Sequence, residues 1–363
     1  MRDLNCPCRD AGRMGGEIRS PRRIRQSNME LLRLLSMFFV LALHANATAI
    51  EVPTADDIQA APLPSFTRIF LEQATVVAVD VFVLISGWFG IRPTLKGAGN
   101  FAFQVAFYAV ALAVCAAVFR PGLVDMREVG YMLCFGACWW FVPSYAILYM
   151  MAKPLNTFVE HSDKRTLGIF VVVFFMAQLM FDRSPLLFYS QGYSPWSFIG
   201  LYLLARYLRL YASRWTGHRA RNYFAGYFLL VVSASLIGFL PPLLGFKSFS
   251  AGHLQYSYNS PLVILESVML LLAFARLEFS SKVVNTLAAS CFAIYLIHAS
   301  PLLWPYFLSF FRDIYGTFSG VVYLMVVFAV LVGTALACIL IDRVRLAAWR
   351  WFQSRAGKWR QVR

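Results

Sequence analysis

Two ionisable side chains, Arg33 and His44, stand in an otherwise apolar stretch, LLRLLSMFFVLALH, at residues 31–44. Ionisable residues inside spanning segments usually mark function, because insertion at mid-helix costs roughly 2.5–3.5 kcal/mol. His44 follows Arg33 by eleven residues, and a helix of that length makes three turns plus roughly 20° while rising about 16.5 Å. We therefore expect both side chains on one helix face. An imidazole there can act as a general base, and a guanidinium can hold an anionic group.

Each of these two residues also has a structural alternative. Arg33 can extend to the lipid phosphates at the membrane surface, and His44 can make a hydrogen bond between helices. The shared face favours a cavity lined by both side chains, because charged groups inside a membrane usually face water or a partner.

Further polar side chains interrupt later apolar runs. Asp80, in AVDVFVLISGWFGIR, can orient a catalytic imidazole or make a packing hydrogen bond, and the sequence favours neither. Tyr295 and His298 lie three residues apart and share a helix face, although His298 is equally compatible with a structural role. Glu266 is expected in the outer half of its span. Trp140 can stack on a sugar, but an aromatic belt at the membrane interface is favoured.

The elements that must position these residues are membrane helices. Of the 363 residues, 59% are hydrophobic and 14% are charged, against about 45–50% and about 25% in soluble domains. A spanning helix needs about 20 mostly apolar residues. The sequence therefore predicts an all-α polytopic membrane protein with about ten transmembrane helices. The predicted spans are 31–50, 69–91, 101–119, 129–151, 167–182, 196–211, 223–245, 261–279, 288–311 and 318–341.

The basic residues in the loops and at the ends of these spans predict the orientation. With the N-terminus in the cytoplasm, the cytoplasmic segments hold 26 Lys and Arg and the outer segments hold 6, as the positive-inside rule requires. Both termini are therefore expected to be cytoplasmic. We expect a disordered basic tail at 1–28, a membrane domain at 29–345 and a basic tail at 346–363. The net charge of +15 resides largely in these segments, so no nucleic-acid partner is expected.

Several classes of chemistry are disfavoured by the motifs that the sequence lacks. It contains no dinucleotide-binding loop, no Walker loop, no HExxH and no GxSxG elbow. Five of the seven cysteines lie in apolar runs, and no histidine stands at metal-binding spacing from the others, so no metal is expected. The small residues Ser86 and Gly87 are expected where two helices approach closely.

Four blocks together resemble the membrane-bound acyltransferase-3 family, in the branch that includes bacterial polysaccharide O-acetyltransferases. They are NMELLRLLSMFFVLALHA, DVFVLISGWFG, CWWFVPSYAILYMMAKPLN and YNSPLVILESVMLLLAFARLEF with SCFAIYLIH. The resemblance implies a multi-pass protein of the bacterial inner membrane. It also implies acetyl-CoA as the acyl donor, bound from the cytoplasm. The acceptor would be a hydroxyl of a glycan or lipid-linked saccharide.

The resemblance also implies roles for individual residues. The family's arginine and catalytic histidine correspond to Arg33 and His44. Separately from the resemblance, we expect Asp80 to orient the His44 ring or to stabilise its charged form. The family's basic cluster after the Ser-Gly block is reduced here to Arg92 and Lys96. We expect these two, together with Arg33, to hold the donor, with the pair Arg206 and Arg209 as an alternative. The expected substrate-binding residues are His298, Tyr295, Glu266 and Trp140.

Two other functions remain open at this point. A polytopic glycosyltransferase with a lipid-linked donor would use paired acids in the first outer loop, where Asp56 and Asp57 lie, although a solvated acidic loop is favoured. A transporter of glycan intermediates is the third possibility, but no internal repeat of the kind that many transporters contain is visible.

Overall fold

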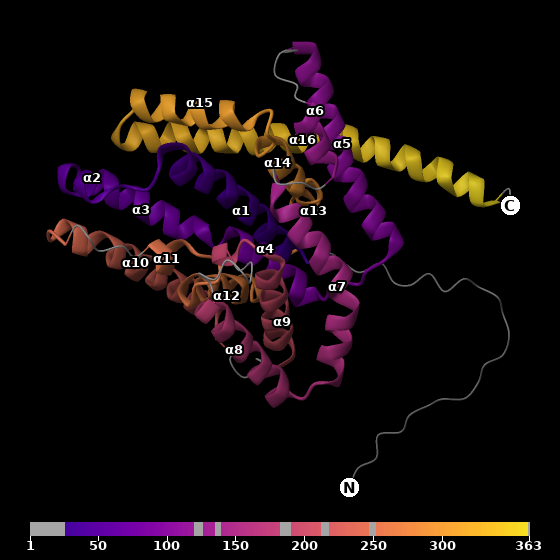
Figure 1. The fold of residues 1–363 in the computed structure, drawn as a ribbon, viewed down its shortest axis with the longest axis horizontal. Coiled ribbons are helices and arrows are strands. Elements are labelled where there is room, and N and C mark those ends of the chain that lie inside the picture. The colour runs from indigo at the N-terminus through magenta and orange to yellow at the C-terminus, as the bar shows by residue number, and fades with distance from the viewer. Residues whose placement is uncertain are drawn as a thin grey trace, which may run out of the picture.

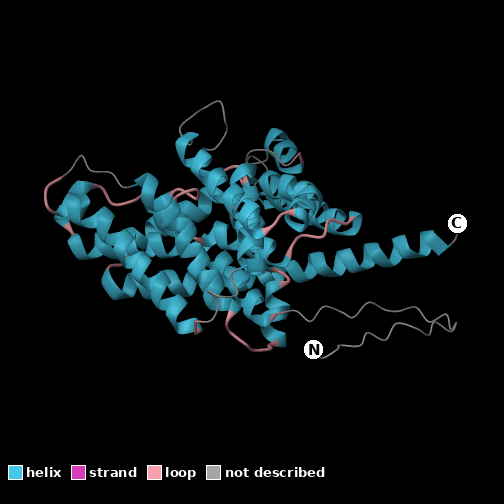
Figure 2. Cartoon of the chain, turned by 90° about the horizontal axis from the view of Figure 1, so that it is seen from below, coloured by secondary structure: helices cyan, strands magenta, loops and turns pink. Residues whose placement is uncertain are grey.

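The computed structural model describes residues 26–119, 126–134, 139–181, 190–211, 218–246 and 252–361. These residues form helices joined by short loops, and no strand occurs among them (Figure 2). The predicted all-α class is therefore confirmed. Most of the expected disordered tail, residues 1–25, lies outside the described residues. The first helix begins at Ser27, so the last two residues of that expected tail are helical.

Sixteen α-helices are described, and Figure 1 labels them in chain order. Their bounds are α1 Ser27–Leu43, α2 Ala55–Ala60, α3 Pro62–Val76, α4 Ala78–Phe89, α5 Leu95–Phe119, α6 Met126–Leu133, α7 Phe141–His161, α8 Lys164–Phe181, α9 Pro195–Tyr211, α10 Ala220–Leu243, α11 Gly252–Tyr256, α12 Pro261–Ala275, α13 Lys282–Ala288, α14 Cys291–His298, α15 Trp304–Thr317 and α16 Gly320–Gln361.

Seven helical segments in the described part of the chain are long and apolar enough to cross a membrane. They are Ser27–Thr48, Pro62–Phe89, Leu95–Phe119, Lys164–Phe181, Ala220–Leu243, Leu254–Ala275 and Gly320–Ser354. Each corresponds to one of the ten predicted spans. The chain is therefore a polytopic membrane protein.

Of the other three predicted spans, the sixth is a single helix as predicted but a short one, and the other two are broken in the structure. The fourth, 129–151, is interrupted, because α6 ends at Leu133 and α7 begins at Phe141. The sixth is α9, which has only 17 residues. The ninth, 288–311, was wrong as one helix, because α14 ends at His298 and α15 begins at Trp304. Pro301 follows the end of α14 and has no N–H with which to continue it.

Helix α1 occupies the middle of the bundle, between α3 and the group formed by α14, α15 and α16 (Figure 1). It packs on α3, α4, α13 and α14. Helix α16 extends past the rest of the bundle toward the C-terminus (Figure 1). A buried cluster joins α16 to α5, where the Tyr108 hydroxyl donates to Asp342 (2.7 Å) and Arg345 is ion-paired with the same carboxylate.

Gly87 marks a close approach between α4 and α9, as predicted for this small residue. A Cβ placed on Gly87 would lie 2.6 Å from the carbonyl oxygen of Tyr202 and 2.8 Å from the Cβ of Ala205. Overpacking at such a contact typically costs about 1–3 kcal/mol. We therefore expect Gly87→Ala to lower the free energy of unfolding by that amount, measured as a reduced thermal midpoint in detergent.

The matched control for this prediction is Gly99→Ala in α5. Apart from the adjacent residues and the backbone of α5 itself, no atom of the described residues lies within 4 Å of the position that a Cβ on Gly99 would take. Alanine is favoured over glycine in a helix interior by roughly 0.5–1 kcal/mol, so this variant should be unchanged or slightly more stable. Equal destabilisation by both substitutions would contradict the close contact at Gly87.

Candidate functional site

The residue directly after the end of α1 begins a π-helical turn, His44–Thr48. π-helical turns are rare and are found frequently at functional sites. Neighbouring helices hold this turn from two sides. The Asn46 side-chain amide donates to the Glu72 carboxylate of α3 (2.9 Å), and Arg312 of α15 donates to the Ala49 carbonyl (2.6 Å). These contacts determine the direction in which the His44 side chain leaves the helix.

His44 is paired with a second histidine from α14. His44 Nδ1 lies 2.9 Å from His298 Nε2, and His298 Nδ1 lies 2.5 Å from the Ile294 carbonyl oxygen. A carbonyl oxygen only accepts, so His298 Nδ1 carries the proton and donates it. In the neutral ring, His298 Nε2 is then an acceptor, and His44 Nδ1 must donate to it. The hydrogen bonds thus leave the lone pair of His44 on Nε2.

Aromatic rings enclose the histidine pair. The Trp304 indole packs edge-on against the His44 ring at 4.8 Å between centroids, and the Phe307 ring lies 5.2 Å from the His298 ring. His298 is 3% exposed. On its far side this residue also borders a cavity of about 570 Å³ between α14, α15 and α16. The packing restricts both rings to one orientation.

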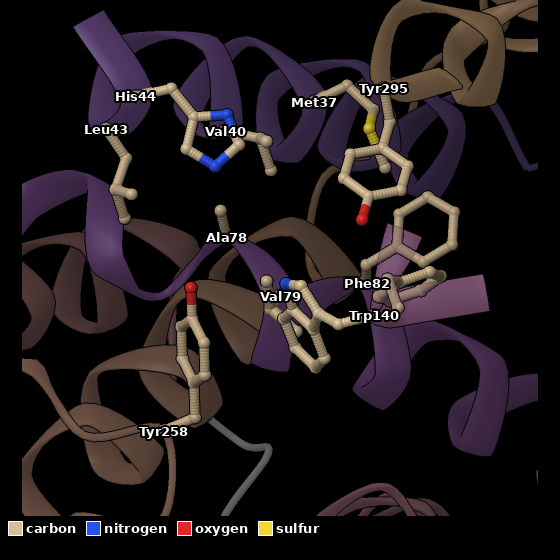
Figure 3. Close-up of a pocket in the computed structure, with 11 residues that line it drawn as sticks. Met37, Val40, Leu43, His44, Ala78, Val79, Phe82, Trp140, Tyr258 and Tyr295 are labelled. Carbon is tan, nitrogen blue, oxygen red and sulfur yellow. The ribbon is translucent and has the colours of Figure 1, made fainter. Parts of the chain in front are cut away.

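His44 lines a small cavity between α1, α4 and the start of α7, which we call the His44 cavity (Figure 3). About 20 Å³ of it is open to the centre of a water molecule. Figure 3 shows one nitrogen of the His44 ring directed toward Ala78 and the middle of the cavity. The residues around it are Met37, Val40, Leu43, His44, Ala78, Val79, Phe82, Trp140, Phe141, Tyr258 and Tyr295.

Arg33 lines a larger neighbouring cavity, the Arg33 cavity, of about 310 Å³. Its residues are Glu30, Arg33, Phe82, Asn100, Phe101, Gln104, Phe141, Tyr145, Ala288, Ala289, Cys291 and Phe292. Arg33 Nη1 is ion-paired with Glu30 at 2.7 Å. Phe82 and Phe141 line both cavities, and their rings meet edge to face at 5.6 Å. The two residues predicted on one face of α1 therefore reach adjacent cavities with a shared aromatic wall.

The Arg33 cavity also contains an unused hydrogen-bond donor. Gln104 is 7% exposed, and its Nε2 has no partner among the described residues. Lys96 precedes Asn100 by one turn on α5, so it lies on the helix face that borders this cavity. The cavity thus combines polar donors with a cation near its edge.

Asp80 does not take the place predicted for it beside His44. Its side chain is fully buried, and neither carboxylate oxygen has a hydrogen-bond partner in the described part of the chain. Its neighbours Ala78, Val79 and Phe82 line the His44 cavity, whereas Asp80 does not. His298 is the partner of the imidazole instead. Asp80 was expected to orient the His44 ring, but the residue that contacts the ring through a hydrogen bond is His298.

The other predicted residues divide between the site and its surroundings. Trp140 and Tyr295 line the His44 cavity. Glu266 does not line either of these two cavities, and its carboxylate accepts from the Gln73 amide (3.0 Å). Arg92 is exposed on the segment between α4 and α5. A hydrogen bond from the Ile91 N–H to the Tyr202 hydroxyl holds that segment against α9.

Sequence reasoning missed several residues of the site. Tyr258 reaches the His44 cavity from the loop before α12. Gly192, with a φ of +91°, packs directly against the backbone of this loop at Tyr258, where a Cβ would clash. No local pattern marks Tyr258 as a site residue. Trp304 and Gln104 were likewise missed, because their positions depend on how distant helices pack.

Comparison with known families identifies the family of the chain. Residues 26–343 match the family model described as the acyltransferase domain of the acyltransferase-3 family. No curated protein and no solved structure matches the chain. The matched region contains α1, the histidine pair and both cavities. The chain therefore belongs to the acyltransferase-3 family and is a multi-pass membrane acyltransferase.

Proposed function

We propose that this protein transfers an acyl group, foremost acetyl, from acyl-CoA to a hydroxyl of a glycan or lipid-linked saccharide. The observation that carries the proposal is the hydrogen-bonded chain from His44 to His298 to Ile294. It presents an unprotonated His44 Nε2 to a cavity, which is what a general base requires. The family membership supports acyl transfer as the reaction.

The proposed reaction proceeds by attack of the acceptor on the thioester. His44 Nε2 takes the proton of the acceptor hydroxyl, and the oxygen attacks the thioester carbonyl carbon. The carbon–sulfur bond then breaks, and the leaving thiolate receives the proton from His44 as free CoA. While the ring is cationic, both its nitrogens are donors, and His298 Nε2 accepts from Nδ1.

Attack on the thioester carbon forms a tetrahedral intermediate with a negatively charged oxygen, and two tyrosines are positioned to stabilise it. The hydroxyls of Tyr295 and Tyr258 point into the His44 cavity from different sides (Figure 3). Hydrogen-bond donors aimed at the developing oxyanion are usually the largest single contribution to such catalysis. We assign this role to the two hydroxyls, which deepens the substrate-binding role predicted for Tyr295.

The donor is proposed to occupy the Arg33 cavity. Arg33 uses Nη1 to hold Glu30, so contact with the donor falls to its other N–H groups. Lys96 stands one turn beyond the cavity wall and is placed to meet the CoA phosphates. Because Phe82 and Phe141 line both cavities, a donor in the Arg33 cavity is proposed to extend its thioester past these two rings toward His44. We propose that the donor enters from the cytoplasm, because the predicted orientation of a bacterial inner-membrane protein with cytoplasmic termini puts Arg33 near that side.

The acceptor is proposed to approach along the aromatic side of the His44 cavity. Trp140 stacks on Tyr258 with 5.9 Å between ring centroids, and Tyr193 lies 4.5 Å from Trp140. Tyr193 is 44% exposed, so these rings run from the surface to the cavity. Aromatic faces of this kind suit the apolar face of a sugar ring.

One of the two acids that a glycosyltransferase would use, Asp57, is engaged in a structural contact. The Thr54 N–H and hydroxyl donate to the Asp57 carboxylate at 2.8 and 2.7 Å, and Asp57 N–H donates back to Thr54 (3.2 Å). This capping box begins α2, and its hydrogen bonds hold the pKa of the Asp57 carboxyl below its usual value. Asp57 is thus explained by helix capping.

The test uses membranes that contain the protein, acetyl-CoA labelled in the acetyl group, and the surface saccharide of the host. We expect label in the saccharide together with stoichiometric free CoA, and the same rate from a variant with Asp56→Asn and Asp57→Asn. Thr54 remains the N-cap, and an asparagine side-chain oxygen can still accept from its N–H, so loss of acyl transfer in that variant would contradict a purely structural role for the two acids. A glycosyltransferase would give neither labelled saccharide nor free CoA. Saccharide movement without CoA release would favour the transporter.

A further inference from the structure

We propose that the His44 cavity restricts the transferred acyl group to a short, uncharged chain, with Ala78 and Val79 setting the limit. The inference rests on the proposed function and concerns the same site. It assigns a specificity to this chain that family membership alone does not supply.

The first argument is the room beside the base. In a reactive complex the attacking oxygen lies about 3–3.5 Å from the thioester carbon and within hydrogen-bond reach of His44 Nε2. The thioester carbon and the first atoms of the acyl chain therefore lie in the His44 cavity. About 20 Å³ of that cavity is open to the centre of a water molecule, and one water requires roughly 10–15 Å³ by this measure. The space suits an acetyl group and leaves little for further methylenes.

The second argument is the chemistry of the walls. The lining consists of apolar and aromatic side chains with the His44 imidazole, and it includes no lysine or arginine. A carboxylate at the end of an acyl chain would be buried there without a cation, which is strongly unfavourable. The cation on the same helix as His44 is Arg33. It lines the adjacent cavity and is paired with Glu30. Dicarboxylic acyl groups such as succinyl are therefore excluded.

The third argument identifies the residues that set the limit. Phe82 and Phe141 are packed against each other on the side of the cavity that adjoins the Arg33 cavity, where the rest of the donor is proposed to lie. Figure 3 shows Ala78 directly facing the His44 ring, with Val79 beside it near Trp140. Ala78 and Val79 are 1% and 8% exposed. Because Val79 borders the cavity, its two methyl groups occupy space that a longer acyl chain would need.

The experiment compares acetyl-, propionyl-, butyryl- and succinyl-CoA as donors with the full-length protein. One methylene in an apolar pocket typically changes kcat/KM by 10–200-fold. We expect kcat/KM for acetyl-CoA to exceed that for butyryl-CoA by at least 100-fold in the wild type. Val79→Ala should narrow this ratio at least tenfold, mainly by raising butyryl transfer. Succinyl-CoA should be a poorer donor than butyryl-CoA.

Two further variants make the experiment decisive. Val173→Ala, at a residue of α8 that is 59% exposed, should leave the ratio unchanged. Ala78→Val should reduce propionyl transfer more than acetyl transfer, which tests the proposal even where Val79→Ala does not fold.

The outcomes separate the two proposals. No transfer from any donor by the wild type would overturn the proposed function. Equal transfer of acetyl and butyryl, an unchanged ratio in both cavity variants, or efficient use of succinyl-CoA would overturn the size and charge limit. In each of those three results, acyl transfer itself would still stand.

Discussion

Alanine in place of His44 is expected to lower kcat for acyl transfer by about 10²–10⁴-fold, the usual contribution of a general base. The lone pair on Nε2 faces the cavity, and Ala78, Val79, Trp140 and the tyrosines around it carry no other base. The KM for the donor should change little, because the donor is held in the Arg33 cavity. Release of free CoA by purified protein in proteoliposomes measures both constants.

The controls separate catalysis from folding. His44→Gln keeps a polar side chain of similar size without a base, and it should lose as much activity as the alanine variant. His161→Ala removes an exposed histidine of α7 that contacts the Thr157 carbonyl, and its activity should be that of the wild type. An active His44→Gln protein would show that the proton goes elsewhere.

Leucine in place of His298 is expected to have the second largest effect, a loss of about 10–100-fold in kcat. Loss of a partner that orients a functional histidine has this magnitude in metal sites. Without His298 Nε2, the proton on His44 Nδ1 has no acceptor there. The ring can then adopt the other tautomer, in which Nε2 is protonated and cannot act as a base.

A second variant distinguishes the positioning role of His298 from a purely structural one. His298→Gln can still present an oxygen to His44 Nδ1, so we expect it to recover at least part of the activity lost in His298→Leu. Donor KM should be similar in both variants, because neither alters the Arg33 cavity. Comparable losses in the two variants, with equal loss of thermal stability, would mean that His298 only fills space.

The sequence predicted the part of the site that depends on a single helix. Helical periodicity placed Arg33 and His44 on one face, and the structure puts them in adjacent cavities with shared walls. The π-helical turn at His44 was not predicted, because tertiary contacts through Asn46 and Arg312 hold it in place. Regular periodicity contains no signal for such a turn.

The pairing of His44 with His298 could not be predicted from spacing, since 254 residues separate them. The sequence grouped His298 with Tyr295 by their shared face, but a helix face does not specify what packs against it. Asp80 was misplaced for the same reason. Its polarity suggested the site, whereas the packing of α4 directs Ala78 and Phe82 toward the cavity instead.

The spans show a similar division. Hydropathy identified seven helices correctly as long apolar segments. It failed at 288–311, where the break after His298 carries a local signal, because Ser300 precedes Pro301 and such residues disfavour the helical region. Reading that dipeptide as a helix boundary would have separated α14 from α15, and it would have placed His298 at a helix end.

The central claim is that His44 is the base and that His298 acts only through it. The most direct test is the protein that carries both His44→Ala and His298→Leu, measured for CoA release beside the two single variants. Residues that act as a unit give non-additive losses, so the double variant should have the rate of His44→Ala to within about twofold. A double variant that loses the product of the two single effects would contradict the account.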